Sequence, residues 1–211
     1  MEHEVRHGGI KLKPRKAIAT YFIISLNVLA FALEVKLWGS TNLANLYRLG
    51  ALVPEEFVAG SWWRLLTAAF LHFGFLHLLV NMLGLYLFGA RVEFSLGVPR
   101  YLLLYFTTGL GSMLAVTVMS VLGYSKAEFI VGASGCVMGL IGAFTAILLH
   151  DWQRTKARIA FRSLRVIVTL IVLQVIFDLN TPQISFIGHT SGLIIGFVVG
   201  SILNSNWLGR R

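Results

Sequence analysis

Residues 132–150 read GASGCVMGLIGAFTAILLH, a run of small and apolar side chains without a charged residue. An α-helix needs about 20 such residues to cross a hydrocarbon core of roughly 30 Å. Within the run, Gly135, Gly139 and Ala143 recur at every fourth position, so that one side of the helix is smooth. Small side chains at this spacing let two helix backbones approach closely in lipid. The stretch therefore predicts a membrane-spanning helix that packs tightly against a neighbour.

Composition indicates that the rest of the chain follows the same plan. Of its 211 residues, 56% are hydrophobic and 13% are charged, and the mean hydropathy is +0.76. A soluble domain carries about 25% charged residues. Open sheets cannot satisfy their backbone hydrogen bonds in lipid, and the ten-residue alternation typical of a barrel is missing. We therefore predict an all-α, polytopic membrane protein with a bundle of six transmembrane helices. The predicted spans are 17–37, 75–91, 100–122, 132–150, 164–179 and 187–204.

The chain is expected to have three parts. They are a basic cytoplasmic tail at 1–16, the six-helix domain at 17–204 and a short cytoplasmic tail at 205–211. A long external segment, 39–74, joins the first two spans, and its Trp62 and Trp63 suit the headgroup level. The first apolar run, with Ala30-Phe31-Ala32, also resembles a signal peptide with a cleavage site. It continues to Trp38, however, which favours a span.

Lysine and arginine residues indicate how the spans are oriented. The net charge is +9 at pH 7, and all but four of the 18 Lys and Arg residues fall in the terminal tails and two loops. The exceptions are Lys36, Arg48, Arg64 and Lys126. Because loops rich in these residues stay in the cytoplasm, both termini are predicted to be cytoplasmic. A bacterial plasma membrane is the expected location, with an organelle as the alternative. The basic residues are not interleaved with aromatic ones, so no nucleic-acid partner is predicted.

Cysteine and histidine patterns give no reason to expect a metal or another cofactor. Cys136 is the only cysteine, so a disulfide within the chain is impossible and a thiolate zinc site would lack partners. The HExxH motif of zinc peptidases is also missing. We therefore expect chemistry that uses protein groups alone.

Four polar residues inside the predicted spans are candidates for function, because polar groups are expensive in lipid. They are His77, Asn81, Ser134 and His189. Counted at about 1.5 Å per residue from the cytoplasmic boundaries, three of them lie about 21 to 25 Å into the core, and Asn81 lies about 15 Å into it. All four therefore fall in the outer half of the membrane, which predicts a single site.

A second smooth stripe supports the pairing of Ser134 with His189. Glycine recurs at every fourth position of the last predicted span, at Gly188, Gly192, Gly196 and Gly200. Ser134 and His189 each lie beside the outer end of a stripe, where close packing would bring hydroxyl and imidazole within hydrogen-bond reach. Helix packing alone would also explain both stripes.

Acyl transfer needs a nucleophile, a base and donors for the oxyanion, and these residues can supply all three. A neutral histidine can take the proton of a serine near pH 7. Gly132-Ala133-Ser134-Gly135 places the serine at a helix start, where free backbone N–H groups and the helix dipole favour negative charge. His77 and Asn81 are four residues apart, so they project from one helix face and could donate to the same oxygen.

Three further ionisable residues receive structural interpretations. Asp178 could be a third catalytic member, but a solvated helix end or a loop cap is favoured, so the predicted catalytic group is a Ser134–His189 dyad. Glu34 is expected to reach up to the headgroup level. His72 is expected to be a structural hydrogen-bonding residue.

Taken in chain order, the motifs resemble the rhomboid family of intramembrane proteases from about Tyr47 to Leu203. They are Trp63-Arg64, His72-x4-His77-x3-Asn81, Gly89-Ala90-Arg91-Val92-Glu93, Gly132-Ala133-Ser134-Gly135 and Gly188-His189-x2-Gly192-x3-Gly196. The resemblance implies that Ser134 is the nucleophile and His189 the general base. It implies that His77, Asn81 and the Ser134 backbone N–H bind the oxyanion. Structural support is expected from Gly132, Gly135, Met138, Trp63, Arg64, Glu93, Gly192 and Gly196.

The resemblance further implies a serine endopeptidase that uses no cofactor and cuts transmembrane segments of membrane proteins near the outer face of the bilayer. Span five is commonly thought to act as its lateral gate. Met138 stands where many members carry an aromatic residue stacked on the catalytic imidazole. A thioether can also pack on a ring, but the orientation of the His189 ring is expected to be less tightly fixed. One alternative is a non-proteolytic rhomboid that binds transmembrane clients. Another is an unrelated transporter or channel, for which inverted repeats would be the signal.

Overall fold

The computed structural model describes residues 16–125, 129–181 and 186–208. Residues 1–15 of the predicted amino-terminal tail, Lys126, and residues 209–211 of the predicted carboxy-terminal tail lie outside this description. The described part is helical, with a single isolated bridge between Leu52 and Ile130 in place of any strand. The predicted all-α class is confirmed.

Among the described residues, six helical segments are long and apolar enough to cross a membrane, and they correspond to the six predicted spans. The first four are α1 (Ile18–Leu37), the segment α5–η2–α6 (Phe75–Leu96), α7 (Val98–Val121) and α8 (Ser134–Thr155). The last two are α9 (Arg158–Asn180) and α10 (Phe186–Leu208). The chain is therefore an integral, multi-pass membrane protein, as its composition predicts.

The second span is longer and less regular than predicted. It consists of α5 (Phe75–Gly84), a π-helix η2 (Leu85–Gly89) and α6 (Ala90–Leu96). Glu93 in α6 is buried, and its carboxylate accepts hydrogen bonds from the Ala19 and Thr20 backbone N–H groups at 3.1 and 2.8 Å and from Thr20 Oγ1 at 2.7 Å. These N–H groups lie in the first turn of α1 and have no partner within the helix, so Glu93 caps it from a distance.

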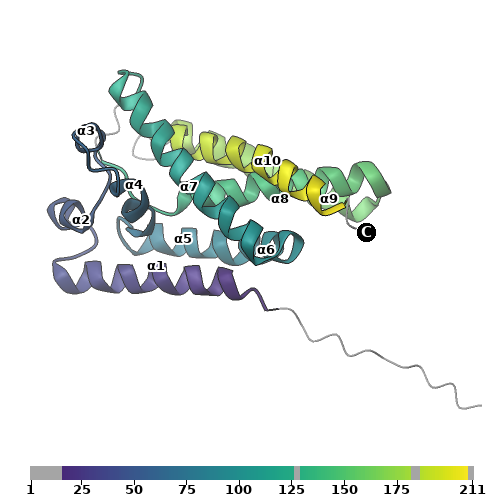
Figure 1. The fold of residues 1–211 in the computed structure, drawn as a ribbon, viewed down its shortest axis with the longest axis horizontal. Coiled ribbons are helices and arrows are strands. Elements are labelled where there is room, and N and C mark those ends of the chain that lie inside the picture. Colours follow the sequence, from purple (N-terminus) through teal and green to yellow (C-terminus); the bar gives the residue numbers. More distant parts are fainter. Residues whose placement is uncertain (1–15, 126–128, 182–185, 209–211) are drawn as a thin grey trace, which may run out of the picture.

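Helix α8 is the centre of the bundle, because it is the most buried of the six spans. Figure 1 shows α10 lying along it, and the glycines explain how closely the two pack. A Cβ atom on Gly192 would strike the carbonyl oxygen of Gly135, and one on Gly196 would strike that of Gly139. The two stripes predicted from the sequence therefore face each other. By contrast, α9 is the least buried span and rests mainly on α8.

The segment between the first two spans forms a cap of short helices at one end of the bundle (Figure 1). It contains α2 (Leu43–Leu49), α3 (Pro54–Val58), α4 (Arg64–Thr67) and the 3₁₀ turn η1 (Ala68–Phe70). Arg64 is buried and donates hydrogen bonds to the Tyr47 and Ala51 carbonyls at 2.9 and 2.7 Å, while its guanidinium stacks on the Tyr47 ring. This residue therefore ties the short helices together. Trp62 and Trp63 are exposed, as expected of residues at the headgroup level.

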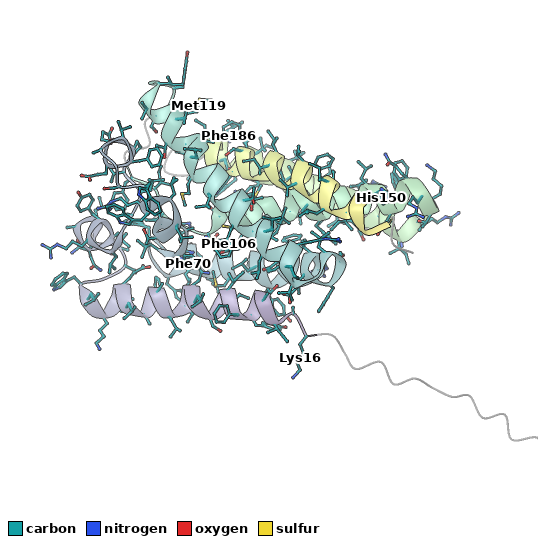
Figure 2. All side chains as sticks on the ribbon, in the orientation of Figure 1. Lys16, Phe70, Phe106, Met119, His150 and Phe186 are labelled. Atoms are coloured by element: carbon teal, nitrogen blue, oxygen red, sulfur yellow. The ribbon has the colours of Figure 1, made fainter. Side chains whose placement is uncertain are left out.

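Large apolar side chains cover the outside of the long helices (Figure 2). Those that are more than half exposed include Phe22, Leu29, Leu103, Leu173 and Ile194. Water would penalise such a surface, whereas lipid does not. In Figure 2, Phe70 of η1 lies on the side of the bundle that carries the cap of short helices, and His150 of α8 lies toward the opposite end.

Candidate active site

The backbone before Ser134 has a shape that only glycine readily adopts. Gly132 has φ +119°, and its N–H donates a hydrogen bond to the Ala68 carbonyl at 2.8 Å. Two residues later α8 begins at Ser134, as predicted, so the serine sits at the positive end of a 22-residue helix. The cap of short helices thus positions the start of α8 through η1.

The His77 imidazole lies directly against Gly132. A Cβ atom on Gly132 would stand 2.6 Å from Cε1 and 2.7 Å from Nε2 of His77, so a larger residue would displace the ring. The Phe73 backbone N–H donates to His77 Nδ1 at 3.3 Å. Because Nδ1 accepts this bond, the ring proton is on Nε2, the nitrogen that faces the segment leading to Ser134. His77 is therefore oriented as a donor toward the segment that carries the serine.

Asn81 lies one helical turn beyond His77 on α5. Its side chain is buried, and Nδ2 donates a hydrogen bond to the His77 carbonyl at 2.8 Å. A primary amide has two N–H groups, so the second remains for another acceptor.

His189 is hydrogen-bonded to Asp178, and this corrects the interpretation of Asp178 as a solvated helix end or loop cap. His189 Nδ1 lies 2.8 Å from Asp178 Oδ2, and the side chains are only 11% and 1% exposed. Gln174 Nε2 donates to the other carboxylate oxygen at 2.7 Å. A carboxylate can only accept, so Nδ1 carries a proton, and in the neutral imidazole Nε2 then keeps its lone pair. The sequence-based interpretation failed because 11 residues separate the two, and only the reversal of the chain between α9 and α10 brings them together.

Ser134 and His189 come from the two helices that pack most closely. Next to Ser134, Gly135 faces the Gly188 carbonyl, whose oxygen lies 3.9 Å from the position of a Cβ atom, and Gly192 packs on the Gly135 backbone. Within the described part of the chain no hydrogen bond joins the Ser134 hydroxyl to His189. Catalytic hydrogen bonds are often long in a ligand-free enzyme and tighten when substrate binds.

Two buried ionisable residues lie beside this group: Glu34 departs from its sequence-based interpretation, whereas His72 is the structural hydrogen-bonding residue that was expected. Glu34 does not extend out of the bundle as expected: it is fully buried, and Oε1 accepts a hydrogen bond from the His72 backbone N–H at 3.1 Å. His72 is also fully buried and bonds the Phe70 carbonyl through Nδ1 at 3.2 Å. Its ring meets the His77 ring edge to face, with centroids 5.2 Å apart. Burial, and then the neighbouring His77, lower the pKa of His72 from 6.5 to about 3, so it is neutral at physiological pH.

Met138 is a further sequence candidate beside the serine, whereas Glu93 lies away from the site, at the first turn of α1. Met138 is buried on α8, one turn beyond Ser134. Among the residues that the structure describes, no aromatic ring stacks on His189, and no three His, Cys, Asp or Glu side chains gather as they would around a metal ion.

Comparison with known sequences identifies proteins that are similar to this chain. Residues 59–206, which include all of the candidate residues, match the model of the rhomboid domain. The chain belongs to the rhomboid family. It is 35% identical over 188 residues, 89% of its length, to the rhomboid protease GluP of Bacillus subtilis, and 33% identical over 79% of its length to the putative rhomboid protease YdcA of the same organism. RHOMBOID-like protein 6, mitochondrial, of Arabidopsis thaliana is 35% identical over 76% of the chain.

These relatives differ in how much of their own length is matched. The chain spans 35% of the length of GluP and 50% of the Arabidopsis protein, and 75% of the shorter YdcA. More than half of GluP and half of the Arabidopsis protein therefore lie outside the matched region.

Proposed function

We propose that this rhomboid is an intramembrane serine endopeptidase that cleaves transmembrane segments of other membrane proteins. The observation that carries the proposal is the hydrogen bond between His189 Nδ1 and Asp178, which leaves Nε2 free to accept a proton beside the helix that begins at Ser134. A buried imidazole held in this tautomer is what a serine nucleophile needs.

The predicted dyad becomes a chain of three residues in this proposal. The Ser134 hydroxyl attacks the carbonyl carbon of the scissile peptide and passes its proton to His189 Nε2. Asp178 orients the imidazole and stabilises the imidazolium that forms. The tetrahedral intermediate then collapses, the C–N bond breaks, and His189 returns the proton to the leaving amine. A water molecule, deprotonated by the same imidazole, hydrolyses the acyl-enzyme.

The oxyanion is proposed to be held by three donors. They are the Ser134 backbone N–H at the start of α8, His77 Nε2–H and the second N–H of Asn81. The orientation of His77 supports this role, because its Nδ1 is occupied by Phe73 and its Nε2 faces the Gly132 segment. Removing one such donor costs about 10² to 10³ in kcat in other enzymes.

The proposed substrates are transmembrane helices that enter from the lipid and are cut near the outer face, often at small residues. The site lies at the end of the bundle that carries the cap of short helices, away from the basic turn between α8 and α9. With positively charged loops inside, this end faces outward, both termini are cytoplasmic, and a bacterial plasma membrane is the proposed location.

Reaction with a fluorophosphonate and cleavage of a model transmembrane substrate in liposomes test the proposal. Wild type should be labelled and active, and the variants Ser134→Ala and His189→Ala should be neither. Ser191→Ala is the matched control: this serine lies on α10 beside His189 but bonds its own helix at the Ile187 carbonyl, so both activities should survive. Cleavage by Ser134→Ala at the wild-type rate would overturn the proposal. A wild type that binds transmembrane segments but neither cleaves nor reacts would favour the non-proteolytic client-binding rhomboid.

A further inference from the structure

Glu34 is a buried carboxyl group that the proposed mechanism does not use. It lies one turn before the outer end of α1 and has no exposed surface. The only ion pair in the described part of the chain joins His189 to Asp178, so no cation neutralises Glu34. Its Oε1 accepts from the His72 N–H, while Oε2 has no partner among the described residues. A carboxyl group is costly to bury without a counter-ion, so the one hydrogen bond that Glu34 makes, to the turn before α5, is the feature to explain.

The end of α1 that carries Glu34 is firmly anchored. Asn45 in α2 is buried, and its Nδ2 donates to the backbone carbonyls of Glu34 and Gly39, both at 3.0 Å. Glu34 therefore connects the capped end of α1 to the loop that precedes α5.

This loop determines the orientation of His77. Glu34 holds the backbone N–H of His72, and the N–H of the next residue, Phe73, donates to His77 Nδ1. The His72 ring adds a neutral edge-to-face contact with the His77 ring. A shift of the loop would remove the Phe73 bond, and the proton of His77 would then be free to occupy either nitrogen.

We propose that Glu34 is a positioning residue for the oxyanion donor: by holding the turn at residues 72–73, it keeps His77 as the tautomer that donates through Nε2. The inference rests on the proposed role of His77. Only the acceptor oxygen is needed for this task, so a neutral amide should replace the carboxyl group.

The test compares Glu34→Leu, which removes the acceptor, with Glu34→Gln, which retains it. Glu34→Leu should lower kcat about tenfold with little change in KM, because small misplacements of catalytic groups have effects of this order or larger. Glu34→Gln should retain most of the wild-type kcat. The matched control is Asn27→Leu. Asn27 is a buried polar residue two turns earlier on α1, its Nδ2 donates to the Ile23 carbonyl of the same helix, and its replacement should leave kcat unchanged.

Two readouts separate positioning from general damage. In the His77→Ala background Glu34→Leu should cause no further loss, since the donor is already gone. In ¹⁵N spectra of the protein in micelles, wild-type His77 should be protonated on Nε2, and Glu34→Leu should show a mixture of tautomers.

The possible failures are distinguishable. If His77→Ala keeps the wild-type kcat, the oxyanion assignment in the proposed function is wrong. If His77→Ala is impaired but Glu34→Leu keeps the wild-type kcat, or its loss adds fully to that of His77→Ala, the role of Glu34 is overturned and the proposed function stands.

Discussion

Replacing Asp178 with asparagine should slow the proposed reaction strongly without altering the fold. Asparagine has the same size as aspartate but carries one oxygen and one NH₂ group. Gln174 Nε2 already donates to one of the two carboxylate oxygens. The asparagine oxygen is expected to stay with that partner, so that the NH₂ group faces His189 Nδ1. His189 would then hold its proton on Nε2, where it cannot accept one from Ser134.

The expected size of the effect follows from the burial of this pair. The side chains of His189 and Asp178 are 11% and 1% exposed, so solvent screens the hydrogen bond very little. A hydrogen bond to a charged group contributes about 1.5 to 3 kcal/mol. At roughly 1.36 kcal/mol for each factor of ten, its loss from the transition state lowers kcat about 10- to 150-fold.

The assay is the initial rate of cleavage of a transmembrane substrate in liposomes, with KM measured in parallel. KM should change little, because Asp178 acts on the base rather than on the substrate. The double variant Asp178→Asn, Gln174→Leu should recover part of the rate, since the asparagine oxygen is then free to turn toward His189. A folded Asp178→Asn protein with kcat within about twofold of wild type would refute the orienting role of Asp178.

Three further predictions concern stability. Glu93→Ala removes all three hydrogen bonds to the first turn of α1 and should lower the free energy of unfolding in detergent by about 3 kcal/mol or more, while kcat per folded molecule is retained. An unchanged midpoint of unfolding would contradict the capping role. Gly196→Ala should lower the free energy of unfolding by about 1 to 3 kcal/mol, because the new Cβ meets the backbone of α8. Gly111→Ala should lower it less, because its Cβ meets only the end of the Ile195 side chain. Equal losses would argue against close backbone packing. Below pH 6.5 His72 is protonated in the unfolded chain but not in the folded protein, where its pKa is near 3. The free energy of unfolding should therefore fall as the pH drops, by up to about 1.4 kcal/mol per pH unit. In His72→Gln this contribution should be missing from the stability measured between pH 7 and pH 5.

Much of the architecture was predictable because membrane helices are constrained locally. Lipid requires each span to satisfy its own backbone, so length and apolar composition identified six spans whose positions the structure confirms. The glycine stripes on α8 and α10 were equally readable, since backbone approach depends only on the absence of side chains at a regular spacing. The second span was less predictable: its apolar pattern does not indicate the π-helix, and the span continues past Arg91 to Leu96, with Glu93 bound to the first turn of α1.

The polar partners could not be inferred in the same way. Sequence alone identified Ser134, His189, His77 and Asn81 as candidates, because uncompensated polar groups in lipid are rare. It failed for Asp178, which was interpreted as a solvated helix end or loop cap, and for Glu34, which was expected to reach up to the headgroup level. Each is buried and has its hydrogen-bond partner in a different element: Asp178 of α9 bonds His189 of α10, and Glu34 of α1 bonds His72 in the loop before α5. Whether a carboxyl group at a helix end meets water or a histidine depends on how neighbouring helices and loops converge, and that is a property of the tertiary structure.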